Sequence, residues 1–233
     1  MASPLFFKSL VGVGGVSVVT TGAVIGIPKL LAEKEYLVSE LIAIHNPEKR
    51  LITSTEVGDS AWKKSWQDYR TVNKNAAKDN DTFKLPDWNG PISQDITSTD
   101  TVKSFLDACF SNSKKKVVTG SKLYEEVLRY CTRDTTIFDL VTESKRIPLS
   151  KTTQNANSPE WRSAWNSYVR DNSDDTGDAW NINSYGTEKA KVNQDHAVSE
   201  DFRSKCETNL ASTLIKDAKL IEQVKSWCTK VAE

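Results

Sequence analysis

Two stretches of this chain carry the same pattern of rare aromatic residues. Residues 61–73 read AWKKSWQDYRTVN, and residues 160–172 read EWRSAWNSYVRDN. The positions that agree, each 99 residues after its counterpart, are Trp62, Trp66, Tyr69 and Asn73 in the first stretch and Trp161, Trp165, Tyr168 and Asn172 in the second. A spacing of i, i+4 and i+7 puts the aromatic rings on one face of a helix. Each stretch therefore predicts an amphipathic helix.

The agreement continues downstream at a shift of 97 residues. The matching residues are Phe105, Cys109, Leu123, Val127 and Cys131, which recur as Phe202, Cys206, Leu220, Val224 and Cys228. The dipeptides Trp88-Asn89 and Trp180-Asn181 are interpreted as a further equivalent pair, with a short deletion between them. So many matches in a fixed order indicate an internal duplication. We predict repeat unit 1 at residues 51–134, a connector at 135–147 and repeat unit 2 at 148–233.

Helix signals place three helices in each unit. In unit 1 the first enters after Asp59-Ser60, the second starts near 98–100 and the third near Ser121, where residues typical of helix N-caps stand. A polar stretch around Trp88, bounded by Pro86 and Gly90, separates the first two helices and predicts a long loop. The predicted fold class is mainly α, with two tandem three-helix units and long polar loops.

An apolar segment precedes these units. Residues 9–28 carry no charge and lie between Lys8 and Lys29. A helix of this length spans roughly 30 Å, the thickness of the hydrocarbon core of a bilayer. We predict an uncleaved signal-anchor in residues 1–31, and a stalk helix in residues 32–50 that prolongs it. A cleaved secretory signal and a soluble buried helix remain the alternatives.

Gly22 and Gly26 form a small-xxx-small pair within the predicted anchor. Such a pair lets two membrane helices pack closely, which would give a weak homodimer. The alternative is that glycine is simply common in this segment.

The four cysteines fall into two equally spaced pairs. Cys109 and Cys131 are 22 residues apart, as are Cys206 and Cys228. Four cysteines allow three connectivities, and a duplication favours one bridge inside each copy. Disulfides are typical of small exported domains, so these bridges would put the body outside the cell. The alternative is four reduced cysteines that act as small apolar residues on helix faces.

The composition excludes several classes of site. Lys plus Arg and Asp plus Glu both number 31, so no net positive charge favours a nucleic-acid partner, and the triplet Lys114–Lys116 is too short for one. Only two histidines are present, and no catalytic, cofactor-binding or metal-ligating motif occurs. The acidic run at residues 171–178 lacks the spacing of a helix-loop-helix calcium site, because Asn183 stands where the terminal glutamate belongs.

The aromatic residues offer two interpretations. At helical spacing, Trp62, Trp66 and Tyr69 and their counterparts are more often core than the lining of a ligand groove. Trp88 and Trp180 lie in predicted loops, so we expect them to be the exposed contact residues.

The chain resembles a large paralogous family of uncharacterised proteins of haemotropic mycoplasmas. The resemblance rests on the Gly/Val-rich N-terminal segment, the W-x3-W-x2-Y helix, and the aromatic-cysteine pairs in Tyr130-Cys131-Thr132 and Trp227-Cys228-Thr229. It covers nearly the whole chain and implies a surface-exposed or secreted protein that serves host contact or antigenic variation. It implies no enzymatic activity and no cofactor.

These observations favour a non-enzymatic, single-pass protein of the cell membrane with an extracellular body. Its expected partners are the membrane, through residues 9–28, and a host surface molecule. The alternative is an inward-facing, membrane-tethered scaffold or assembly subunit with reduced cysteines. An enzyme with an unrecognised site is disfavoured, because acid-base catalysis needs convergent titratable groups and the sequence places none together.

Overall fold

The computed structural model describes residues 34–173 and 177–231, which are mainly helical. The predicted anchor at residues 9–28, with Gly22 and Gly26, lies outside this range. Within the two described ranges, no helix combines the length and the apolar character that crossing a membrane requires.

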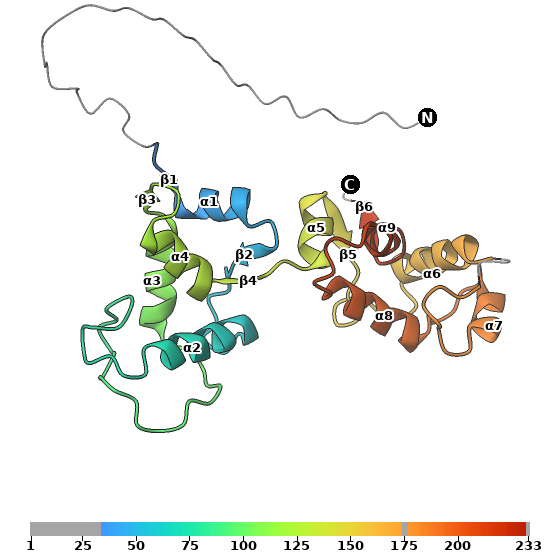
Figure 1. The fold of residues 1–233 in the computed structure, drawn as a ribbon. Coiled ribbons are helices and arrows are strands. Elements are labelled where there is room, and N and C mark those ends of the chain that lie inside the picture. Colours follow the sequence, from blue (N-terminus) through green and yellow to red (C-terminus); the bar gives the residue numbers. More distant parts are fainter. Residues whose placement is uncertain (1–33, 174–176, 232–233) are drawn as a thin grey trace, which may run out of the picture. The chain divides into compact units, whose positions relative to one another are not determined.

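The N-terminal half of the described chain contains four helices and four short strands (Figure 1). In chain order these are β1 (Tyr36–Leu37), α1 (Val38–His45), β2 (Lys49–Leu51), α2 (Ser60–Val72), α3 (Lys103–Ser113), β3 (Lys116–Val117), α4 (Lys122–Tyr130) and β4 (Thr132–Asp134). Strand β1 pairs antiparallel with β3, and β2 pairs antiparallel with β4. The long segment between α2 and α3 has no regular structure.

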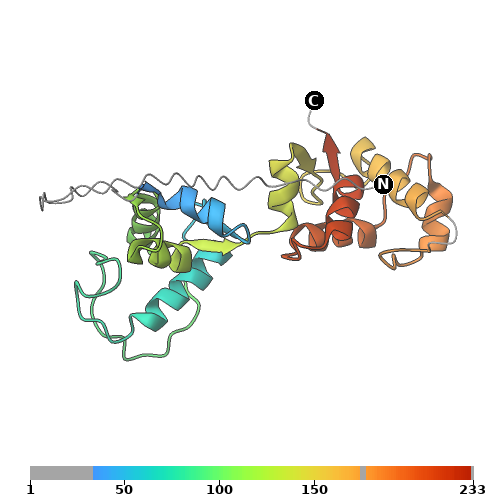
Figure 2. The ribbon, with the colours of Figure 1, turned by 45° about the horizontal axis from the view of Figure 1, so that its top comes forward.

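The C-terminal half follows a similar order. It contains α5 (Ile137–Glu143), β5 (Arg146–Pro148), α6 (Pro159–Asp171), α7 (Tyr185–Glu188), the 3₁₀ helix η1 (Lys189–Lys191), α8 (Glu200–Leu210), α9 (Ala218–Trp227) and β6 (Thr229–Val231). Strands β5 and β6 form an antiparallel pair (Figure 2), the counterpart of β2 and β4.

Side-chain caps set where the aromatic helices begin. The Asp59 carboxylate accepts hydrogen bonds from the backbone of Ala61 and Trp62 at the start of α2. Ser158 caps α6, where Pro159 fills the first helical position because its missing N–H is not needed there. The start of α2 agrees with the sequence prediction.

The second predicted helix begins later than expected. Helix α3 starts at Lys103 rather than near residues 98–100. The Thr101 N–H donates to the carbonyl of Val57 at 3.0 Å, and Thr101 is buried. This tertiary hydrogen bond holds the preceding segment outside the helix.

The predicted stalk helix is wrong. Lys34 and Glu35 are not helical, and the next two residues form strand β1. Helix α1 is only eight residues long, and its Val38, Leu41 and Ile42 are buried in the core of the N-terminal half. This part of the predicted stalk therefore belongs to the globular body, although Ile44 of the same helix is exposed.

The prediction that residues 135–147 form a connector is also wrong. Residues 137–143 form α5, and its Ile137 and Val141 are fully buried in the core of the C-terminal half. Each half therefore begins with a short helix that the sequence analysis assigned to a linker. For this reason, the predicted number of three helices in each unit is lower than the number in the described residues.

Candidate functional site

The aromatic stripes form the centre of each core. Trp62, Trp66 and Tyr69 are at most 7% exposed. Their counterparts Trp161, Trp165 and Tyr168 are all fully buried. The burial of these six residues thus supports their interpretation as core residues. They are not available to line a ligand groove.

The rings of the two cores meet in matching pairs. Trp66 stacks on Tyr69 with 5.6 Å between ring centroids, and Trp165 stacks on Tyr168 at the same distance. Phe105 and Phe202 occupy equivalent centres, since each contacts the three aromatic residues of its own helix. Edge and tilted contacts of this kind stabilise a core beyond the burial of area alone.

A tyrosine hydroxyl organises the irregular segment in each half. The Tyr69 hydroxyl donates to the Asp81 carboxylate and accepts from the N–H of Phe83 at 2.8 Å. Burial, together with the Asp81 hydrogen bond, raises the pKa of Tyr69 well above its ordinary value of 10. This group therefore keeps its proton at neutral pH and donates it to the hydrogen bond with Asp81.

The same arrangement recurs at Tyr168. Its hydroxyl donates to Asp178 and accepts from the N–H of Trp180 at 2.9 Å. Burial, with the hydrogen bond to Asp178, again raises the pKa of Tyr168 above 10. Neither aspartate could be predicted from the sequence, because isolated acidic residues in polar loops carry no pattern. Asp81 lies 12 residues after Tyr69, whereas Asp178 lies 10 residues after Tyr168, because the shift between the matching residues changes from 99 to 97 in this segment.

A buried asparagine follows each aromatic helix and forms a hydrogen bond to its last turn. The Asn73 amide donates to the Tyr69 carbonyl at 2.8 Å and accepts from the N–H of Thr82. Asn172 donates to the Tyr168 carbonyl at 2.7 Å and accepts from the N–H of Ala179. Both asparagines are buried, and both attach the following segment to the helix.

These contacts correct the predicted equivalence of the tryptophan dipeptides. Phe83 and Trp180 play the same part, because each N–H donates to the tyrosine hydroxyl of its half. Trp88 corresponds instead to Tyr185: each ring contacts the second tryptophan and the tyrosine of the aromatic helix. Even the left-handed backbone at Lys84 (φ 53°) recurs at Asn181 (φ 50°).

Trp88 and Trp180 are not exposed contact residues. They are 4% and 8% exposed, respectively. The Trp88 indole N–H donates to the carbonyl of Ala76 at 2.9 Å, and that of Trp180 donates to the side chain of Gln223 at 3.2 Å. The expectation failed because the long loops fold back over the aromatic helices and bury their rings.

The four cysteines form two disulfides, one in each half. Cys109 bonds to Cys131 and Cys206 bonds to Cys228, with a Cα–Cα distance of 5.4 Å in both. Each bridge joins a cysteine within one helix to the C-cap of the helix that follows it, α3 to α4 and α8 to α9. This is the pairing predicted from the duplicated spacing.

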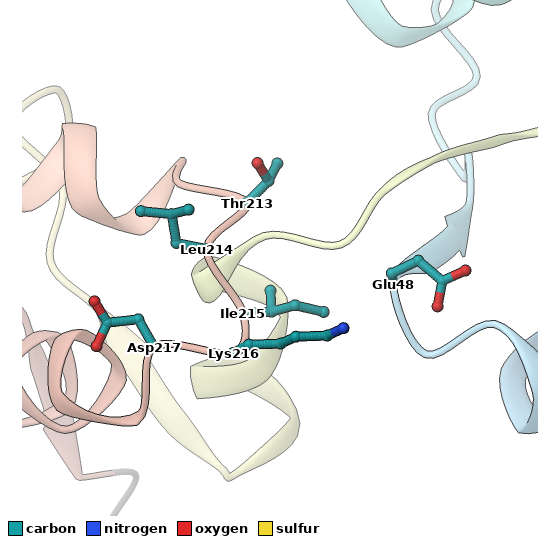
Figure 3. Close-up of a pocket in the computed structure, with 6 residues that line it drawn as sticks. All are labelled: Glu48, Thr213, Leu214, Ile215, Lys216 and Asp217. Carbon is teal, nitrogen blue, oxygen red and sulfur yellow. The ribbon is translucent and has the colours of Figure 1, made fainter.

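The described residues hold no cluster of metal-ligating side chains, and they include an open depression at the loop before α9. In residues 34–173 and 177–231, no group of three His, Cys, Asp or Glu side chains is placed to hold a metal. An open depression of about 300 Å³ is formed mainly by the loop before α9 (Figure 3). Its lining residues are Glu48, Thr213, Leu214, Ile215, Lys216 and Asp217.

No family model, curated protein or solved structure matches this chain. The interpretation of function therefore rests on the chain itself.

Proposed function

We propose that this protein is a non-enzymatic, membrane-anchored surface protein. Residues 9–28 form its single-pass anchor, and its body faces the outside of the cell. Following the family that it resembles, the body contacts a host surface molecule or serves as a variable antigen.

The observation that carries this proposal is the disulfide in each half. A bridge that closes a loop of this size stabilises a small domain by about 3 kcal/mol, and such bridges persist in oxidising compartments. The surrounding tyrosine and asparagine contacts hold the ends of loops, so the buried polar groups have structural rather than catalytic roles.

We also propose that the body contains two diverged copies of one unit. The support is the recurrence of particular contacts: the tyrosine–aspartate bond, the asparagine clamp and the disulfide. The β2–β4 pair and the β5–β6 pair add a matching backbone feature, since each joins the strand after the first helix of its half to the strand after its last helix. On the support of these contacts, we propose copies of about residues 36–134 and 137–231, which begin earlier than the boundaries predicted from the sequence.

The cellular location is tested by mapping the cysteines in intact cells. Cells are treated with an alkylating reagent before lysis, without reductant, and the cysteine peptides are identified by mass spectrometry. We expect the linked peptides Cys109–Cys131 and Cys206–Cys228 and no alkylated cysteine. Alkylation of all four cysteines would support the inward-facing scaffold instead.

Protease treatment of intact cells supplies an independent measurement. The extracellular body should be degraded while a cytoplasmic control protein remains intact. Protection of the body in intact cells, with digestion only after lysis, would overturn the proposed orientation.

A further inference from the structure

An exposed aromatic ring lies among three lysines at the end of α3. Phe110 is 66% exposed, and the Lys114 ammonium lies 3.6 Å from the centre of its ring. Lys115 and Lys116 follow directly and are also exposed. We call Phe110, Lys114, Lys115 and Lys116 the Phe110–lysine patch. Within the described part of the chain, none of its lysines forms an ion pair with a carboxylate.

The patch is attached to the first residues of the body. Lys116 in β3 pairs with Leu37 in β1, and the Val38 N–H donates to the carbonyl of Lys115 at 3.0 Å. Figure 1 shows β1 and β3 together where the chain enters the N-terminal half. Only residues 29–35 separate β1 from the predicted anchor. Seven residues span at most roughly 25 Å, so the chain length alone keeps β1 near a membrane that holds the anchor.

We call the junction between the end of α3 and the start of α1 a corner. The C-terminal half has the equivalent corner between the end of α8 and the start of α5, but without these residues. There, the Ile137 N–H donates to the carbonyl of Ser212 at 2.9 Å, as Val38 does to Lys115. By this correspondence, the counterparts of the patch are Glu207, Ala211, Ser212 and Thr213. The fold therefore does not require a phenylalanine or a lysine at this corner. Lysines at a helix C-terminus can offset the helix dipole, but this effect would apply equally to both corners and does not explain why only one has three lysines.

We propose that the Phe110–lysine patch binds the anionic headgroups of the membrane in which the chain is anchored. Lysines beside an anionic bilayer gain electrostatic attraction, and an exposed aromatic ring partitions into the interface. The patch is basic and aromatic, none of its lysines pairs with a carboxylate of the described residues, and it lies in the half that follows the predicted anchor. This inference rests on the proposed anchor, and it gives the N-terminal half a membrane-facing corner that the C-terminal half lacks.

The test uses the full chain reconstituted into vesicles, one set of phosphatidylcholine alone and one with 30% phosphatidylserine. A membrane-impermeant amine reagent labels exposed lysines, and mass spectrometry reports labelling at residues 114–116 relative to the exposed Lys219 of the same molecules. This ratio removes differences in orientation between vesicles. We expect the ratio to fall at least five-fold in the phosphatidylserine vesicles and to recover in 1 M NaCl, because salt screens surface charge.

A variant taken from the chain's own counterpart supplies the matched change. Lys114→Ala, Lys115→Ser and Lys116→Thr together reproduce the C-terminal corner, so the fold is expected to remain. Each lysine contributes roughly five-fold to binding, so the triple variant should lower binding of an unanchored chain, residues 34–233, to the anionic vesicles by roughly 100-fold. Lys74→Ser, Lys78→Ser and Lys219→Ser remove the same charge elsewhere and should lower it far less. Circular dichroism of this fragment, with and without the substitutions, verifies that it is folded.

Two results would overturn the proposal: equal labelling ratios in the two kinds of vesicle, or equal losses of binding in the two triple variants. Extraction of the vesicles with alkaline carbonate tests the anchor separately. A chain that resists extraction but shows no protection of the patch disproves the inference and leaves the proposed anchor intact. A chain that is extracted while its isolated body still binds anionic vesicles through the patch disproves the anchor instead.

Discussion

At the scale of single residues, the two first tryptophans of the aromatic helices differ in one hydrogen bond. The Trp62 indole N–H donates to the carbonyl of Ser54 at 2.7 Å. The indole N–H of Trp161 is buried without a hydrogen-bond partner in the described ranges. Both rings pack edge-on against the phenylalanine of their half, so the comparison isolates the polar contact.

We therefore expect Trp62→Phe to cost about 1 kcal/mol more than Trp161→Phe. Both changes lose similar apolar contacts, but only the first breaks a hydrogen bond, while the second removes a buried donor that lacks a partner. Hydrogen exchange of α2 and α6 in each variant measures the free energy of opening of each half. Equal costs in the two variants would show that the Ser54 contact contributes nothing.

The buried tyrosines predict a loss of stability at alkaline pH. Burial and the aspartate partners raise the pKa of Tyr69 and Tyr168 in the folded state, whereas in the unfolded chain it stays near 10. The stabilising effect is thus complete below pH 10 and is lost as the pH rises above 10. The maximum slope is about 1.4 kcal/mol per pH unit for each tyrosine.

The check is urea unfolding at pH 8 and at pH 11 for the native chain and for Tyr69→Phe with Tyr168→Phe. The double variant should be less stable at pH 8, because each aspartate loses a donor. It should also lose less stability between the two pH values. An unchanged alkaline loss would assign the effect to other groups.

At the scale of elements, the start of α5 combines a cap with an ion pair. Asp139 accepts from the Thr136 N–H at 2.8 Å and from Arg133 at 2.7 and 2.8 Å. Burial alone would raise the pKa of Asp139, but the hydrogen bonds from Arg133 and Thr136 outweigh it and lower the pKa to about 2. These contacts tie β4 to the first turn of α5.

Asp139→Asn should therefore destabilise the chain by about 1–2 kcal/mol at pH 7. In the native chain, this contribution is present above the unfolded pKa of 3.8 and disappears as the pH falls towards 2. Denaturant unfolding at pH 7 and pH 2.5 measures both effects, and the variant should show the smaller difference between them. Asp134→Asn serves as a control, because that carboxylate lies on the neighbouring strand, is half exposed and does not cap the helix.

At the scale of the whole molecule, the described core residues fall into two clusters with no member in common. Each cluster contains one disulfide. Removing one bridge should therefore weaken one half and leave the other nearly unchanged.

Cys206→Ser with Cys228→Ser should lower the stability of the C-terminal half by about 3 kcal/mol, the effect of opening a loop of this length. Thermal unfolding followed by hydrogen exchange should show early opening of α8 and α9, with α3 and α4 unaffected. Cys109→Ser with Cys131→Ser is the matched variant and should give the reverse pattern. Simultaneous opening of both halves in either variant would mean that they unfold as one unit.

The amino-acid sequence by itself determined the aromatic helices, their caps and the pairing of the cysteines. These features depend on local periodicity and on spacing: Trp62, Trp66 and Tyr69 share a helix face wherever that helix lies, and Asp59 caps it through its own backbone neighbours. The same reasoning assigned α1 and α5 to linkers, because eight or fewer residues with a short apolar stripe look alike in a stalk and in a core.

Only the tertiary structure decided where the long loops go. Trp88 and Trp180 stand in segments without periodicity, and their burial depends on Tyr69 and Tyr168 accepting loop N–H groups that are distant in the chain. The tertiary structure also decided that Phe110 is exposed to solvent beside three lysines. The sequence does not indicate this exposure, because Phe110 directly follows a core cysteine on the same helix. The physical reason is the same in each case: burial is set by the partner that a side chain meets across the fold, which local sequence does not specify.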